Sequence, residues 1–180
     1  MSRPITGKTF SRRDVLFSLL GRWQRSDSPR QPIGFDAQSR EIEACLAEND
    51  LEEAARLLEE VLAKSPDHIQ AMQKLAYCRL KLGRPQEAVD LLRQVRSLKP
   101  QDNFAALYLG LSLCRLGSLE EAMKTWQGYF NVDQPVIQRA VNLQLALYEM
   151  DGPTSAEDIA AAVEEAIEEQ ERLDTNKSWR

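Results

Sequence analysis

A repeat of 34 residues constrains the fold of this 180-residue chain more than any other feature. Three alanines, each preceded by a glutamate, stand 34 positions apart, and a large apolar residue follows each of them four positions later. The alanines are Ala54, Ala88 and Ala122, and the apolar residues are Leu58, Leu92 and Trp126. A unit this short cannot bury its apolar face alone, so successive units must stack on one another. The sequence therefore predicts a solenoid.

Each unit is predicted to consist of two antiparallel helices joined by a tight turn. In the second unit, apolar side chains recur at helical spacing over residues 69–82 and again over residues 85–98. Gly83 suits the left-handed conformation that ends a helix, and Pro85 suits the first turn of the helix that follows. The other two units place Asn49 and Gly117 at the corresponding turn.

These motifs resemble the tetratricopeptide-repeat family. Its pattern combines a leucine followed by a small residue, an alanine with a large residue four positions later, and a closing proline. The third unit carries Leu109-Gly110, Ala122 and Trp126, and the second carries Leu75-Ala76, Ala88, Leu92 and Pro100. The resemblance covers residues 35–136, although the first unit keeps only the second half of the pattern. It implies an all-α fold, a right-handed α-α solenoid of tetratricopeptide helix pairs with a C-terminal capping helix.

The chain is expected to divide at the boundaries of these units. The predicted parts are a basic N-terminal segment at 1–34 with a short amphipathic helix at 11–23, a repeat-like first unit at 35–68, a second repeat at 69–102, a third at 103–136, a divergent fourth helix pair or cap at 137–174, and a tail at 175–180. The last predicted helix has one acidic face. We interpret it either as a solvated outer face or as a docking surface for a basic partner.

In this family the first helices of successive units line a concave groove, so the resemblance implies a surface for a partner peptide or helix. The predicted groove residues are Gln70, Lys74, Tyr77, Lys81, Phe104, Leu107, Tyr108, Leu111, Arg115, Val141, Asn142 and Leu145. The late end of this set is apolar and aromatic, which on a solvent-facing surface needs a reason. Either the groove receives a partner segment anchored by Tyr77, Phe104 and Tyr108, or the chain itself covers the patch.

One ligand of the family is disfavoured by the residues present. The family's carboxylate clamp grips an acidic peptide tail with Lys and Asn residues at fixed groove positions. The matching positions here hold Ser39, Glu43, Lys74, Phe104 and Tyr108. Only one of them is basic and none is Asn, so a terminal carboxylate of that kind is not expected as the ligand.

The N-terminal segment carries a second motif. Residues 11–23 begin Ser-Arg-Arg and resemble a degenerate twin-arginine signal, with candidate recognition residues Arg12, Arg13, Leu16, Phe17, Leu20 and Trp23. Val15 departs from that signal, the apolar stretch is short, and no small-residue cleavage site follows, so we expect the segment to stay uncleaved. Three roles are open: packing on the first repeat or folding into the groove, recognition by a partner, and contact with a membrane surface.

Composition disfavours several classes of function. A single histidine, His68, and three widely spaced cysteines supply no metal-ligand spacing and no nucleophile-histidine pair, so we predict no catalytic residues, no metal and no cofactor. The net charge of −5 disfavours nucleic-acid binding. We therefore predict a cytoplasmic, non-enzymatic adaptor or assembly factor that binds a protein partner. The alternative is a membrane-associated or twin-arginine-exported component located by residues 11–23. The sequence does not indicate an oligomeric state.

Overall fold

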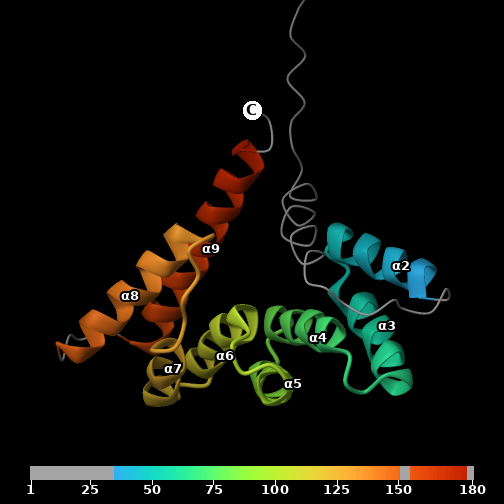
Figure 1. Ribbon diagram of the computed structural model, residues 1–180, viewed down its shortest axis with the longest axis horizontal. Helices are drawn as coiled ribbons and strands as arrows, with labels where there is room; N and C mark the ends of the chain where they lie inside the picture. Colours follow the sequence, from blue (N-terminus) through green and yellow to red (C-terminus); the bar gives the residue numbers. More distant parts are fainter. Residues whose placement is uncertain (1–34, 151–154, 178–180) are drawn as a thin grey trace, which may run out of the picture.

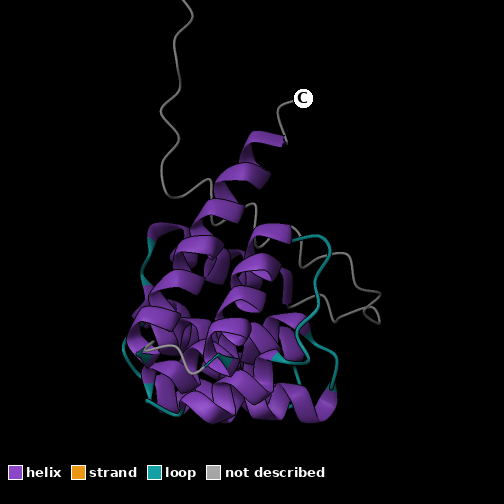
Figure 2. Cartoon of the chain, turned by 90° about the vertical axis from the view of Figure 1, so that its left-hand side faces the viewer, coloured by secondary structure: helices purple, strands orange, loops and turns teal. Residues whose placement is uncertain are grey.

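The described part of the chain is built from α-helices only. The computed structural model describes residues 35–150 and 155–177, and Figure 2 shows helices joined by loops throughout these residues. The helices are α2 (Phe35–Glu48), α3 (Leu51–Lys64), α4 (Ile69–Lys81), α5 (Pro85–Leu98), α6 (Asn103–Arg115), α7 (Leu119–Trp126), α8 (Pro135–Glu149) and α9 (Ala156–Lys177). They pack as helix pairs in chain order and end with a C-terminal helix, which confirms the predicted fold class. The candidate recognition residues in 11–23 lie outside the described residues.

Local sequence signals explain where these helices begin and end. The side chain of Asp102 caps α6 by accepting from the amide of Ala105 at 2.8 Å. His68 caps α4 in the same way through Nδ1. Gly83 and Gly117 both have φ of +74°, so each takes the left-handed conformation expected at the turn of its unit. Asn49 takes the same conformation in the first unit with φ of 60°.

The helix pairs curve into an arc. In Figure 1, α4 and α6 line the inner side of this arc, and α5 and α7 line its outer side. The repeated alanines and the large residues after them are fully buried between the two layers, because the small alanine lets neighbouring helices approach closely. This burial gives the 34-residue motif its structural role.

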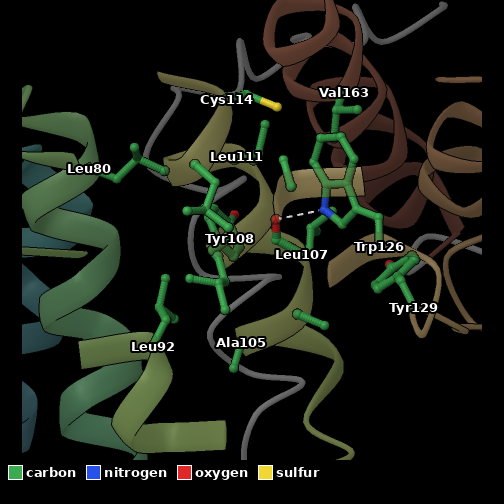
Figure 3. Close-up of a cluster of buried hydrophobic side chains, with 14 of the residues drawn as sticks. Leu80, Leu92, Ala105, Leu107, Tyr108, Leu111, Cys114, Trp126, Tyr129 and Val163 are labelled. Carbon is green, nitrogen blue, oxygen red and sulfur yellow. Dashed lines mark hydrogen bonds between the residues drawn. The ribbon is translucent and has the colours of Figure 1, made fainter. Parts of the chain in front are cut away.

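Trp126 is the largest of these core side chains. Its indole is fully buried, and Nε1 donates a hydrogen bond to the carbonyl of Leu107 at 3.1 Å (Figure 3). The ring lies directly over Gly110, where a Cβ atom would come within 2.1 Å of Nε1. The Leu-Gly pair of the third unit therefore leaves room for the tryptophan of the next helix.

The fourth helix pair departs from the repeat geometry. α8 packs mainly against α9 and touches α7 only at its edge, whereas α9 packs against α6. Ile159, Val163 and Ile167 of α9 belong to the same buried cluster as α6. The C-terminal helix thus covers the last full repeat, and its Glu157 and Glu164 form ion pairs with Arg115 of α6.

Candidate functional site

The structure does not keep the predicted groove residues together on one surface. Leu107, Tyr108 and Leu111 of α6 and Val141 of α8 are buried, and Leu111 is only 1% exposed. These four side chains therefore do not form an open apolar patch. The physical reason is that the apolar face of α9 packs against α6, and Figure 3 shows Val163 of α9 near Trp126 and Leu111. At this end of the predicted groove, the chain itself therefore covers the apolar side chains.

Arg115, another predicted groove residue, takes part in holding α9. It forms ion pairs with Glu157 and with Glu164, the latter at 2.6 Å between Nη2 and Oε2. Both carboxylates belong to α9, where seven residues, or about two helical turns, separate them. Arg115 thus orients the covering helix, and part of the acidic face of α9 is used within the molecule.

Two further groove residues lie away from the others. Asn142 and Leu145 are on α8, and α8 and α4 stand on opposite sides of α9 in Figure 1. Asn142 accepts a hydrogen bond from Gln138 at 3.0 Å within its own helix, and Leu145 packs against the core. The structure does not bring these two residues next to Tyr77 or Lys81.

The remaining groove residues share one face. We call them, together with a glutamate of α9, the inner surface: Gln70, Lys74, Tyr77 and Lys81 of α4, Phe104 of α6, and Glu171 of α9. The ring of Tyr77 meets the buried ring of Tyr108 edge to face, with centroids 5.7 Å apart. Phe104 lies against the same ring at 4.3 Å, tilted by 34°. The aromatic anchors are thus held in fixed positions by a core tyrosine.

Charged side chains border the rings of Tyr77 and Phe104, which we call the aromatic floor. Lys81 Nζ lies 5.9 Å from the centroid of the Tyr77 ring, in a cation–π arrangement. Lys74 forms an ion pair with Glu43 of α2, which ties α2 to α4 at the inner surface. This pair places a carboxylate at one of the positions that the family's clamp fills with Lys or Asn.

Glu171 is the residue that sequence reasoning did not single out. Burial raises the pKa of this carboxyl to about 7, Lys81 opposes the rise, and Glu168 adds to it. Its charge also acts on the hydroxyl groups of Tyr77 and Tyr108 and helps to raise the pKa of each. A signal existed in the sequence: Glu171 follows Ile167 by four residues and so lies at the edge of the apolar stripe of α9.

Two of the three cysteines are buried in the described helices. Burial raises the pKa of Cys78 and of Cys114 to about 12, so neither thiol is an activated nucleophile. Across residues 35–150 and 155–177, no three His, Cys, Asp or Glu side chains are grouped so that they could hold a metal ion.

Comparison with known proteins agrees with this geometry. Residues 46–109 match the family model described as Tetratricopeptide repeat. The match covers helices α3 to α5 and the first half of α6. Repeats of this family stack into solenoids whose concave side binds proteins, and the fold is typically that of a non-catalytic scaffold. No curated protein sequence matches the chain.

Three solved structures are similar to this chain over most of its length. The structure described as "MamA RS-1 ArsTM double mutant" has a TM-score of 0.57 at 22% identity, covering 87% of this chain and 84% of that one. A structure of a MamA mutant has a TM-score of 0.54 at 20% identity, covering 92% and 94%. "MamA MSR-1 C2" has a TM-score of 0.51 at 20% identity, covering 90% and 95%. At these identities the likeness concerns the fold.

Among the residues that the structure describes, no helix combines the length and the apolar character needed to cross a bilayer.

Proposed function

We propose that this protein is a non-enzymatic adaptor or assembly factor that holds a helical or extended segment of a partner protein on its inner surface. The observation that carries the proposal is the arrangement of Tyr77, Phe104 and Lys81. Two aromatic side chains, fixed by a buried tyrosine and bordered by a lysine and a glutamate, form an anchor site with a polar rim. Such a combination is typical of the residues that carry binding energy at protein interfaces.

The proposed surface is shorter than the predicted groove. α9 covers the apolar end, so a partner segment would contact α4 and the start of α6 and would run between α2 and α9. Because Tyr77 and Phe104 are partly buried already, each contributes one edge to the surface and the remainder to the core. The partner must therefore supply side chains that fit small aromatic edges.

Affinity purification with cross-linking mass spectrometry tests this function. The bait is the full chain, compared with Lys81→Glu on the inner surface and with Lys124→Glu on the outer helix α7. Both lysines are exposed, so both variants are expected to fold as the wild type does. The proposal expects one protein to cross-link to Lys74 or Lys81, and its yield to change in Lys81→Glu alone. Equal yields from all three baits, with cross-links only to Lys124, would overturn it.

A further inference from the structure

We propose that the chain's own basic segment, residues 11–23, binds on the inner surface and places an arginine beside Glu171. The inference rests on the proposed function because it names an occupant for the same surface. Residues 11–23 lie outside the described residues and enter the argument by their sequence alone. Four observations support the assignment: the state of Glu171, the charge of α9, the place where the described chain begins, and the aromatic floor.

Glu171 is a partly buried carboxylate of α9 at the inner surface. Within the described residues it forms no ion pair, although Lys81 is near enough to act on it electrostatically. Its pKa is raised because desolvation of the charge outweighs the attraction of Lys81, and Glu168 adds to the rise. A guanidinium between Glu171 and the Tyr77 ring would supply hydrogen bonds to the carboxylate and a flat face to the ring. The site thus has the chemistry of an arginine receptor.

The charges of the two segments are complementary. α9 carries acidic residues at eight positions and basic residues at two. Residues 1–34 carry seven basic and two acidic side chains, and three of the arginines lie within 11–23. At physiological ionic strength the screening length is about 8 Å, so this attraction acts only when the segment lies against α9. The complementarity therefore favours contact with this surface over a distant interaction.

The chain enters the described region beside the inner surface. α2 begins at Phe35, and Glu43, eight residues later and about 12 Å along the helix, contacts Lys74 of α4. The eleven residues 24–34 can span at most about 40 Å when fully extended. This length is enough to return residues 11–23 to a surface that lies next to α2.

The apolar side chains of residues 11–23 are also complementary to the inner surface. If residues 11–23 form the predicted amphipathic helix, Leu16, Leu20 and Trp23 fall on one side and the arginines border it. The partly buried edges of Tyr77 and Phe104 are the apolar surface next to Glu171. Segment and surface therefore agree in their apolar parts and in their charge, and a bound segment would compete with a partner for the same anchors.

Nuclear magnetic resonance of the full-length, ¹⁵N-labelled protein tests the inference. The test variant is Arg12→Glu/Arg13→Glu/Arg22→Glu. Its control, Arg3→Glu/Lys8→Glu/Arg30→Glu, makes the same change in charge outside residues 11–23. We expect the backbone amide resonances of Tyr77, Lys81 and Glu171 to shift in the test variant, to stay in place in the control, and to be independent of protein concentration.

Three outcomes would overturn the inference. They are unchanged resonances at the inner surface, equal shifts in both variants, and shifts that appear only as the concentration rises, which would indicate binding between copies. The partner-capture experiment distinguishes this failure from failure of the proposed function. Unchanged resonances combined with a Lys81-dependent partner would leave the function standing and remove only the internal occupant.

Discussion

A single missing methyl group at Gly110 determines how α6 and α7 meet. The Trp126 indole occupies the space that a side chain at position 110 would need, and it satisfies its only donor on the carbonyl of Leu107. The Leu-Gly pair and the following tryptophan are thus two halves of one contact. Because the core is closely packed, the ring has no empty space into which it could move.

Gly110→Ala is expected to lower the free energy of unfolding. Alanine gains about 1 kcal/mol in helix propensity, but the clash with Trp126 outweighs this gain, and the expected net loss is about 1–3 kcal/mol. Urea denaturation of the two proteins measures the difference. Gly128→Ala is the matched control, since its Cβ would meet only the carbonyl of Thr125 at 4.0 Å. Equal effects of the two substitutions would contradict the account of this contact.

His68 makes the stability of α4 dependent on pH. Its Nδ1 accepts a hydrogen bond from the amide of Ala71, which requires the neutral ring, and desolvation by burial lowers the pKa of His68, with Lys74 adding to the effect. A lowered folded-state pKa means that this stabilisation is fully present above the unfolded pKa of about 6.5 and is lost as the pH falls through the folded value.

We expect His68→Asn to remove this dependence. Asparagine is a strong cap at any pH, so the variant should equal the wild type at pH 7.5 and exceed its free energy of unfolding at pH 5 by about 1 kcal/mol. Urea denaturation at the two pH values tests this, and because His68 is the only histidine, its titration can be followed directly by NMR. A stability difference that stays constant between the two pH values would show that the cap does not titrate.

At the scale of the helices, α9 is the element that departs from the repeat. It covers α6 with Ile159, Val163 and Ile167, and Arg115 fixes it through two carboxylates. α6 is consequently buried on almost all sides, from Ala105 to Cys114. Without α9, the side chains of Leu107 and Leu111 would lose part of their cover.

Val163→Asp is expected to detach α9 and to lower the free energy of unfolding by about 3 kcal/mol or more, because it buries an unpaired charge. The exposed apolar face of α6 should then bind the dye ANS. Ala161→Asp introduces the same residue at an exposed position of the same helix and should change the stability by about 0.5 kcal/mol or less. If the two variants were equally stable, α9 would not be packed on α6.

The sequence predicted the helix pairs well because their signals are local. Gly83, Pro85 and the repeated alanines each act within one turn or one contact, and a 34-residue offset carries them from unit to unit. The position of α9 depends on contacts between distant segments, so periodicity could define its apolar face but not the helix that this face meets. One signal was available: α6 is apolar all round, which is typical of a helix covered on every side.

The orientation of α8 in the fourth helix pair also depends on contacts between distant segments. Leu143 and Leu147 belong to an apolar array in α8, yet Leu143 is 54% exposed, whereas the polar Gln144 is buried. Spacing alone could not show which face of α8 would meet α9. Part of the candidate site was affected in this way, because Val141, Asn142 and Leu145 were placed in the groove on the assumption that α8 continued the repeat.

At the scale of the whole molecule, the arc has an inner side that is closed at one end and bordered by α2 at the other. At the closed end, α9 buries most of the predicted apolar patch. The inner surface that remains combines the edges of two aromatic rings, a lysine and a partly buried glutamate. The proposed partner segment therefore has a short footprint. Its binding should depend on a few anchors rather than on a long apolar stripe.

Binding of the cross-linked partner segment to the full chain tests whether the inner surface is the binding site. The segment is synthesised with a fluorescent label, and its Kd is measured by anisotropy for the wild type, Lys81→Glu and Lys124→Glu. We predict equal Kd values for the wild type and Lys124→Glu, and a change of about tenfold or more, equivalent to about 1.4 kcal/mol, for Lys81→Glu. The same Kd for all three proteins would contradict the claim that the inner surface is the binding site.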